Sequence, residues 1–376
     1  MEPFKNRISA ELVGHFSVQL EQHVPGFKRK PFEKTILTQL DDLELKDRAQ
    51  LMADQMDKVL PTAPKKRAKI VRSMLHPRGT EKGQQSDGEG ITGWGMFPLG
   101  MLVGQNGLGD FDGSLNLLKD MTGHFSSEFD VRFFLIEDQD RALGIMLDWV
   151  DHPDYHVRRL LSEGTRPRLP WGLQLPKLIA DPSPMLPLLE ALRDDDEEYV
   201  RRSVANHLND IAKDHPDLVA KLAKKWLKGA SPAREKLVRH ACRSLIKQGH
   251  TATLDAFGLG KPKVELTTLM VKTKKVTFGD TLDFSATIRS TSKQKQSLVV
   301  DYLVHFKKAN GDLVGKVFKW KKVTLAPGEK LTMEKSHPIK PITTRRYYEG
   351  TQGLSLRVNG QDFGSGTFTL DRKSVV

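Results

Sequence analysis

Apolar residues recur every three to four positions through most of the first 260 residues, which is the spacing of helices that bury one face. Over the first 75 residues, prolines divide this pattern into four stretches. The spacing therefore predicts helices over residues 10–22, 32–43, 45–60 and 65–75.

A glycine-rich stretch from Gly79 to Gly113 interrupts the helical spacing. It contains the run GQNGLGDFDG but neither GKS nor GKT, and it does not lie cleanly between a strand and a helix, so a phosphate-binding loop is not indicated. We predict that residues 79–113 form a long glycine-rich loop that ends in a packed turn. Trp94 in this loop suits either a lid beside a site or an anchor on the core, and we favour the anchor.

Helical spacing resumes at residue 115 and continues to residue 257, with four segments that resemble one another. Each of them places a valine before a basic residue and then continues with apolar positions. Repeats of this kind are typical of helical hairpins stacked into a solenoid, so we predict an irregular HEAT-like array. The segments read EFDVRFFL at 128–135, DYHVRRLL at 154–161, EEYVRRSV at 197–204 and, more faintly, EKLVRHAC at 235–242.

After Gly260 the period changes from that of a helix to the two-residue alternation of strands. Turn residues divide this part into six or seven predicted antiparallel strands, the size and spacing of an immunoglobulin-like sandwich. The fold class is therefore mainly α with a separate all-β domain, divided into residues 1–260 and 261–376. The turns are expected at Gly279–Asp280, Asn310–Gly311, Pro327–Gly328 and Asn359–Gly360.

The basic excess of the chain lies entirely in its C-terminal part. Residues 261–376 hold 22 Lys and Arg against 10 Asp and Glu, which equals the net charge of +12 of the whole chain. Such a concentration favours a polyanionic partner, because bound phosphates release counterions. We therefore expect the sandwich to bind DNA, although a basic surface that only keeps the protein soluble has the same composition.

Cysteine content and hydropathy exclude several classes of protein. The single cysteine, Cys242, excludes a disulfide framework and is expected to be a small core residue. No stretch approaches the ~20 apolar residues of a membrane span, and the N-terminus lacks the pattern of a signal peptide. We expect a soluble protein of a reducing cytoplasm.

The run HVRRLLSEGTRPRLPW at 156–171 combines cations, one acid and an aromatic ring. Its two prolines restrict the backbone around Arg166, Arg168 and Trp171, so these side chains have little freedom to lose on binding. Guanidinium groups suit phosphates, and a flat ring close to the carboxylate of Glu163 suits a sugar or a base. The run therefore indicates chemistry on a nucleic acid.

Three carboxylates occupy related places in successive repeats, namely Glu128, Glu163 and Asp210. Around the third of these, Arg202, Asn206 and Asp210 recur every four residues on a helix face apart from the apolar stripe. Neighbouring helices of a solenoid lie about 8–10 Å apart, so acids on one face can converge on one small target. Taken singly, each is an ordinary solvated or paired acid, so the interpretation depends on all three together with the tryptophan.

Three motifs give the chain a specific resemblance. The segments SSEF at 126–129, HVRRLLSEGTRPRLPW at 156–171 and YVRRSVANHLND at 199–210 resemble the AlkC group of bacterial DNA alkylation-repair glycosylases, which is related to the AlkD-like HEAT-repeat enzymes. The resemblance covers the whole helical part, and the basic C-terminal module resembles one found in a subset of the group. Leu161 is a departure, since a smaller residue is expected there, and it bears on packing.

The resemblance implies an activity and assigns site residues. It implies excision of N3-alkylated bases from duplex DNA, chiefly 3-methyladenine and also 3-methylcytosine, without swinging the base into a deep pocket as other glycosylases do. It places catalytic carboxylates at Glu128, Glu163 and Asp210, and a sugar-facing aromatic ring at Trp171.

The chemistry of such a reaction agrees with these residue types. A base alkylated at N3 is already cationic and leaves without a general acid, so the costly species is the oxocarbenium-like sugar. Carboxylates stabilise that cation, and one of them orients water; an indole face adds a cation–π contribution of about 1–2 kcal/mol. No metal or organic cofactor is expected. Flanking phosphates are expected to meet Arg159, Arg166, Arg168, Arg201 and Arg202, beside Asn206.

Duplex DNA that contains alkylated bases is therefore the expected partner of a protein that we expect to be a monomer. The resemblance also implies a bacterial cytoplasmic protein, associated with the nucleoid when it is bound to DNA. His152, His156 and His207 are scattered on polar faces and suit structural or phosphate contacts better than metal ligation. The alternative function is a catalytically silent HEAT-type scaffold that recognises DNA structure or an acidic protein, because fold alone does not decide activity.

Overall fold

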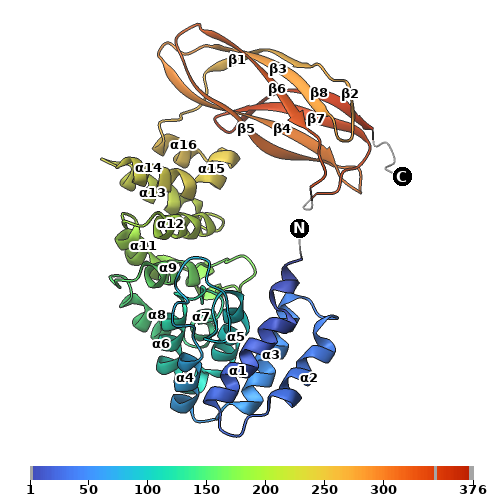
Figure 1. The fold of residues 1–376 in the computed structure, drawn as a ribbon. Helices are drawn as coiled ribbons and strands as arrows, with labels where there is room; N and C mark the ends of the chain where they lie inside the picture. Colours follow the sequence, from blue (N-terminus) through green and yellow to red (C-terminus); the bar gives the residue numbers. More distant parts are fainter. Residues whose placement is uncertain (1–2, 343–344, 372–376) are drawn as a thin grey trace. The chain divides into compact units, whose positions relative to one another are not determined.

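The computed structural model describes residues 3–342 and 345–371, which form two compact units, Met1–Asp214 and His215–Val376. Helices precede strands along the chain (Figure 1). The predicted fold class, mainly α with a separate all-β domain, is confirmed. The helices of the first unit are α1 Ala10–His23, α2 Arg29–Leu40, α3 Leu45–Val59, α4 Pro64–Ser73, α5 Met96–Asn106, α6 Phe111–Met121, α7 Val131–Glu137, α8 Gln139–Leu147, α9 Tyr155–Gly164, α10 Pro176–Ala180, α11 Leu186–Leu192 and α12 Glu198–Ile211.

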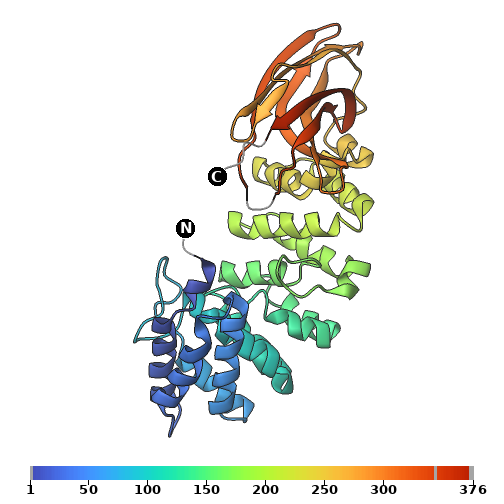
Figure 2. The same cartoon turned by 90° about the vertical axis from the view of Figure 1, so that its right-hand side faces the viewer.

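The four N-terminal helices form where the apolar spacing predicts them. The Ser9 side chain accepts a hydrogen bond from the Leu12 backbone N–H and so caps α1, while Pro64 opens α4 at a position where no backbone donor is needed. Figure 2 shows α1, α2 and α3, in blue, lying side by side. Their facing stripes, including Phe16 and Met52, are fully buried.

The glycine-rich stretch is only partly a loop, and the prediction over 79–113 is wrong from Met96 onward. Residues 96–106 form the buried helix α5, because its glycines permit close approach to the start of α7. A Cβ at Gly100 would lie 2.3 Å from Asp130 Oδ2, and one at Gly104 would lie 2.9 Å from a ring carbon of Phe133. Small residues therefore serve helix packing here, and not only chain reversal.

Trp94 precedes α5 and packs on aromatic rings. Its ring centroid lies 5.4 Å from that of Phe125 and 6.0 Å from that of Phe4. The indole is half-buried, which agrees with the predicted anchor.

The similar segments found in the sequence lie on helices. The first begins α7, the second lies on α9 and the third on α12. On α12, Val200, Val204, Leu208 and Ile211 are buried, as the apolar stripe predicts. α9 packs against α12, and the two helices carry most of the candidate site.

The second unit contains four helices and eight strands, and its helical and β parts belong to one compact unit. The compact units divide at residue 214, whereas secondary structure changes from helix to strand near residue 260. Its elements are α13 Pro216–Trp226, α14 Pro232–Ala241, α15 Arg243–Gln248, α16 Thr251–Ala256, β1 Val264–Val271, β2 Lys275–Thr277, β3 Thr281–Ser290, β4 Gln296–Lys307, β5 Leu313–Leu325, β6 Lys330–Pro338, β7 Gly350–Val358 and β8 Gln361–Asp371.

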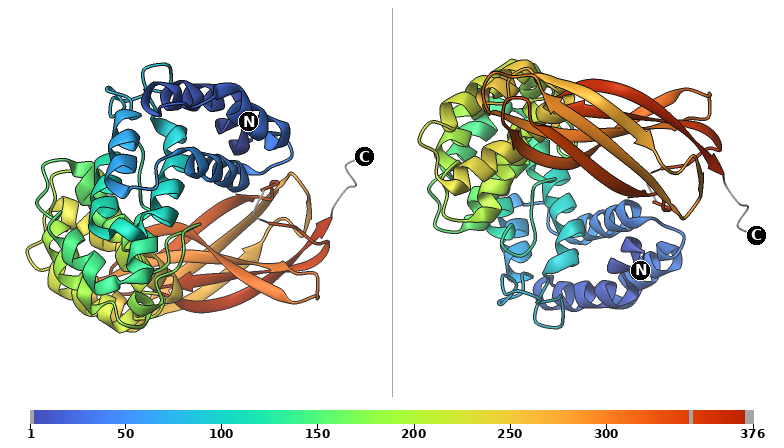
Figure 3. Two further views of the ribbon diagram at one scale, coloured as in Figure 1. Left: turned by 90° about the horizontal axis from the view of Figure 1, so that it is seen from below. Right: turned by 90° about the horizontal axis from the view of Figure 1, so that it is seen from above.

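Figure 3 shows the strands in orange to red. They form a sheet of order β1-β3-β6 and a sheet of order β2-β8-β7-β4-β5. The described residues form eight strands, whereas six or seven are predicted. One strand pair, β2 and β8, is parallel and not antiparallel. β2 has three residues, too few for alternation to be recognised. The four predicted turns all lie between strands; at Asn359–Gly360 both residues have positive φ, 43° and 76°, as a tight hairpin turn requires.

Buried positions alternate with more exposed ones along β3, whereas β4 and β7 each contain a run of consecutive buried residues. Phe284, Tyr302 and Phe368 are buried between the sheets, and Cys242 is a fully buried core residue at the end of α14, as predicted. Burial raises the pKa of the Cys242 thiol to about 12. Within residues 3–342 and 345–371, no helix has both the length and the apolar character needed to cross a bilayer.

Candidate active site

The three acids singled out in the sequence are brought together in the first unit by two arginines. Arg166 donates from Nη1 to Glu163 Oε1 at 2.5 Å and from Nε to Asp210 Oδ2 at 2.8 Å. Arg159 forms an ion pair with Glu128 and lies 3.6 Å from Glu163 Oε1. The side chains therefore form a line of alternating charge, in the order Glu128, Arg159, Glu163, Arg166 and Asp210.

Secondary contacts complete the hydrogen bonding of the three carboxylates. Ser126 Oγ donates to Glu128 Oε2 at 2.7 Å, and Ser203 Oγ donates to Glu163 Oε2 at 2.6 Å. At the far end, Lys213 Nζ lies 2.9 Å from Asp210 Oδ1. Glu163 and Asp210 are accordingly each held by donors on both oxygens.

Burial of the acids departs from the sequence interpretation, which placed Glu163 and Asp210 on exposed faces. Glu163 is 5% exposed and Asp210 is 2% exposed. Helical periodicity treats a charged position as solvent-facing, whereas here Arg166, itself buried, supplies the compensating charge. Removing one partner of such a pair leaves a buried charge without compensation, at a cost of about 3–5 kcal/mol.

Trp171 differs sharply from the buried acids, because its side chain is 76% exposed. Its φ is +67°, a left-handed conformation that non-glycine residues adopt only when surrounding contacts impose it. Lys46 Nζ donates to the Trp171 carbonyl at 3.0 Å. The indole is thus presented to solvent on a constrained backbone, close in sequence to Arg166.

Arg132, on α7, is a positioning residue that the sequence interpretation missed. The side chain is fully buried and donates from Nη1 to the carbonyls of Gly164 and Arg166, both at 2.8 Å, and from Nε to that of Leu173. Burial lowers the pKa of the Arg132 guanidinium to about 10, which leaves it charged at neutral pH. The segment from Gly164 to Leu173, which carries Trp171, is therefore held in place by Arg132. Helical periodicity alone would place this arginine on the surface.

The arginines expected to contact phosphates differ in burial and in their bonding partners. Arg168 forms a two-point pair with Asp214 at 2.7 and 2.8 Å, and Arg202 lies 3.3 Å from Glu198 Oε1 with a side chain that is 66% exposed. Arg201 donates to backbone carbonyls before α12. Arg166 differs from these, since its burial places it among the acids.

Comparisons with known proteins identify the family. The model of the family "Uncharacterised protein YhaZ, C-terminal Ig-like domain" matches residues 265–372. Over 364 residues, 96% of this chain and 97% of the relative, the sequence is 35% identical to "Uncharacterized protein YhaZ" of Bacillus subtilis (strain 168). The solved structure of Pseudomonas fluorescens alkylpurine DNA glycosylase AlkC, bound to DNA containing an abasic site analog, matches with a TM-score of 0.86 and 34% identity, over 98% of this chain and 100% of that chain. The chain belongs to the AlkC family.

The AlkC resemblance of the sequence motifs is therefore confirmed at the level of the family. In this AlkC-family chain, the motif residues Glu128, Glu163 and Asp210 form the alternating line of charges described above. Leu161, the departure from the AlkC pattern, is fully buried on α9.

Two further titratable groups of this AlkC-family chain lie buried near the acids. Burial, together with the nearby Glu128 charge, raises the pKa of Asp130 to about 8, and its Oδ1 has no hydrogen-bond partner among the described residues. His207 was expected on a polar face and is instead fully buried, with Nδ1 2.9 Å from the Ser162 carbonyl oxygen. Burial lowers the pKa of His207 to about 4, so it is neutral at pH 7.

The other two histidines are half-buried on and before α9. His152 Nδ1 accepts from the Asp154 backbone N–H at 3.1 Å, and the His156 ring lies 4.2 Å from that of Tyr155. Across residues 3–342 and 345–371, His, Cys, Asp and Glu form no group of three or more that could hold a metal ion.

Proposed function

We propose that this chain is a DNA glycosylase that hydrolyses the N-glycosidic bond of cationic N3-alkylated bases, 3-methyladenine and 3-methylcytosine, in duplex DNA without deep base flipping. The observation that carries the proposal is the convergence of Glu128, Glu163 and Asp210 on one line of alternating charge, close in the chain to an exposed indole. A protein scaffold has no need of three acids held in this way. The full-length similarity to an alkylpurine DNA glycosylase bound to DNA supports both the activity and the partner.

The leaving group determines what the protein has to supply. A base alkylated at N3 carries a positive charge and departs as a neutral base when the glycosidic bond breaks, so no general acid is required. Positive charge then develops on the deoxyribose, and carboxylates in a fixed position stabilise it. The serine and arginine donors around Glu163 hold this acid in place before substrate arrives.

We assign most of the hydrolysis to Asp210 and Glu163, with Glu128 assisting. A carboxylate stabilises a developing cation and can accept a proton from the attacking water. Trp171 would hold the sugar, since an indole face attracts a developing cation by about 1–2 kcal/mol. Its constrained backbone lowers the entropy lost when the ring contacts DNA.

Flanking phosphates would be held by Arg159, which lies within the line of charges, and by arginines outside that line. Arg159, Arg168, Arg201 and Arg202 take this role in our proposal, with Asn206 on the same helix face. Arg166, which the sequence suggested as a fifth phosphate ligand, would hold Glu163 and Asp210 apart, because it is 7% exposed and bonded to both. The basic sandwich would add contacts to the duplex, as its charge predicts.

Binding of a transition-state mimic distinguishes this function from that of a silent scaffold. Duplex DNA that carries an abasic-sugar analogue with a cationic nitrogen in its ring mimics the charged sugar of the transition state. It should bind at least about a hundredfold more tightly than the same undamaged duplex. Glu163→Gln should remove most of that preference and leave binding of undamaged duplex within about twofold. Equal affinity of the wild type for the two duplexes would favour the scaffold.

A further inference from the structure

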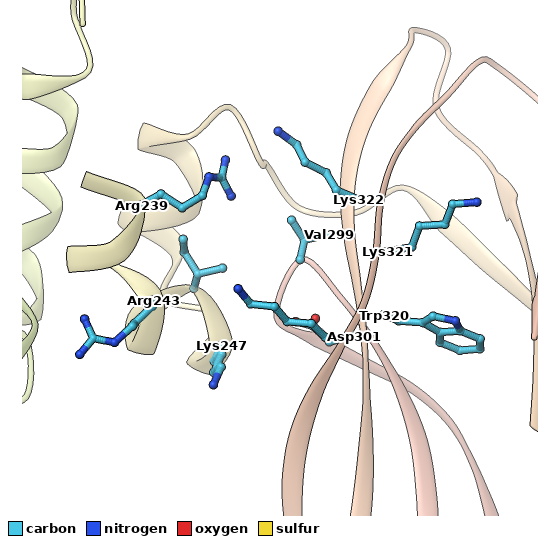
Figure 4. A pocket seen from close by; sticks show the side chains of 10 residues that line it. Arg239, Arg243, Lys247, Val299, Asp301, Trp320, Lys321 and Lys322 are labelled. Carbon is cyan, nitrogen blue, oxygen red and sulfur yellow. The ribbon is translucent and has the colours of Figure 1, made fainter. Parts of the chain in front are cut away.

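A cavity of about 250 Å³ lies within the second unit, between α14–α15 and strands β4–β5. Figure 4 shows Arg239, on α14, and Lys322, on β5, extending toward one another from opposite walls. None of the residues that line the cavity belongs to the compact unit that contains the candidate active site. These lining residues are Arg239, Arg243, Ile246, Lys247, Val299, Asp301, Lys319, Trp320, Lys321 and Lys322.

The charge of this cavity is strongly one-sided. Among its lining residues, six are Lys or Arg and one, Asp301, is acidic. Like charges gathered at the wall of a concave, partly apolar site repel one another and raise the local concentration of anions. Ile246 and Val299, both half-buried, contribute the apolar part of the wall. An anion is therefore the class of ligand that this cavity favours.

The helical wall is held against the sheet by contacts with β7, the neighbour of β4, and with the turn that follows β7. Gly249, at the end of α15, lies so near Gly360 that a Cβ on Gly249 would approach the Gly360 Cα to 2.7 Å. Arg357 Nη1, from β7, donates to the Lys247 carbonyl at 2.8 Å. Asn359 Nδ2 also donates to the Gly260 carbonyl at 2.9 Å. The basic groups are thus presented on a preorganised frame, which lowers the entropy cost of binding.

The volume limits the ligand to a small group. Pockets for drug-sized molecules measure roughly 300–1,000 Å³, and this cavity is smaller. A single phosphate or sulfate group fits the combination of size and charge, whereas a whole nucleotide would extend into solvent.

Asp301 distinguishes phosphate from sulfate as the ligand of this cavity. It is 4% exposed and lies in the cavity wall at a bulge in the β4–β5 pairing. The Trp320 backbone N–H donates to its carboxylate, but its Oδ1 has no hydrogen-bond partner among the described residues. An ionised carboxylate only accepts hydrogen bonds, so the anion beside it must carry a hydrogen.

We propose that this cavity binds a phosphate group that retains a proton: inorganic phosphate, or a terminal phosphate monoester. Basic side chains that extend into the cavity, Arg239 and Lys322 among them, hold the negative oxygens, and the Asp301 carboxylate accepts the P–OH hydrogen. Sulfate and the internal phosphodiesters of DNA carry no such hydrogen at neutral pH. The site is independent of the proposed glycosylase activity, since none of its residues belongs to the first unit.

Titration of the full-length protein with inorganic phosphate, followed by ³¹P NMR and calorimetry at pH 7, tests the proposal. Phosphate should bind at least about tenfold more tightly than sulfate at the same ionic strength, a difference of about 1.4 kcal/mol. The double variant Arg239→Gln/Lys322→Gln should weaken phosphate binding by about tenfold or more. Lys293→Gln removes a charge from an exposed position elsewhere on the sandwich and should change nothing.

The variant Asp301→Asn tests whether the Asp301 carboxylate causes the preference for phosphate over sulfate. The carboxamide both accepts and donates hydrogen bonds, so the variant should bind phosphate and sulfate within about twofold of one another. Circular dichroism and thermal unfolding verify that it folds. The proposal is overturned if wild type binds phosphate no better than sulfate, if neither anion binds below about 10 mM, or if Asp301→Asn keeps the full selectivity.

The two sources of the phosphate group are separated with short duplexes that differ only in a 5′-phosphate. Tighter binding of the phosphorylated duplex, lost in the Arg239→Gln/Lys322→Gln variant, would assign the site to a strand terminus. Equal binding of both duplexes, with inorganic phosphate still bound, would assign it to a free phosphate ligand.

Discussion

Arg166 and Asp210 meet through a 2.8 Å hydrogen bond between Nε and Oδ2, although 44 positions of sequence separate them. Both side chains are buried, and the same guanidinium also contacts Glu163. The pair therefore ties the turn after α9 to α12 and sets the position of two acids at once.

Arg166→Leu should destabilise the protein by about 3–5 kcal/mol, because it removes the buried guanidinium that pairs with both Glu163 and Asp210. Urea unfolding measures the change. Arg202→Leu removes an arginine of an exposed pair and should cost at most about 1 kcal/mol. Similar losses in the two variants would contradict the buried line of charges.

Trp171→Ala should leave the free energy of unfolding almost unchanged, since the side chain is 76% exposed. Loss of the cation–π contribution should lower the single-turnover rate of base excision about 5- to 30-fold. Trp171→Phe should keep part of the rate because it keeps an aromatic face. A rate for Trp171→Ala equal to that of wild type would remove Trp171 from the site.

Asp130→Asn should stabilise the protein increasingly as pH rises. Burial raises the pKa of Asp130 from an ordinary value of 3.8 to about 8, so folding favours the protonated form. The stability that this group provides is complete below about pH 4 and is lost as pH rises toward 8. Asparagine does not ionise, so the gain over wild type should grow between pH 5 and pH 8 in urea unfolding. A difference that stays constant with pH would show that Asp130 is ionised throughout.

Gly100→Ala should destabilise the protein by about 1–3 kcal/mol, because the new methyl group would overlap the Asp130 carboxylate. Gly14→Ala is the matched control, since Gly14 lies within α1 with nothing within 4 Å of the added Cβ. It should stabilise the protein by about 0.4–1 kcal/mol. Equal effects at both positions would contradict the close packing of α5 on the start of α7.

Much of the fold follows from periodicity in the sequence. The helices from Ala10 to Ser73 and the hairpin turn at Asn359–Gly360 occur as predicted, because local spacing and turn chemistry determine them. Helix α5 was missed because glycine usually breaks helices, and only the three-dimensional approach to Asp130 and Phe133 explains Gly100 and Gly104.

The sequence predicts the residue types of the candidate site but not the burial of their side chains. Repetition and family motifs selected Glu128, Glu163 and Asp210, and the structure brings them together. Their burial depends on Arg166, which reaches Asp210 across the fold. No local pattern distinguishes Arg132 from a surface arginine, since its three backbone acceptors lie more than 30 positions away.

Release of free base from methylated duplex DNA, by wild type and by Asp210→Asn in parallel, tests the central claim most directly. Wild type should release 3-methyladenine, and Asp210→Asn should release it at least about a hundredfold more slowly while folding normally. Asp140→Asn changes an exposed acid on α8 and should match wild type. Release by Asp210→Asn at the wild-type rate, or no release by wild type that still binds DNA, would contradict the account.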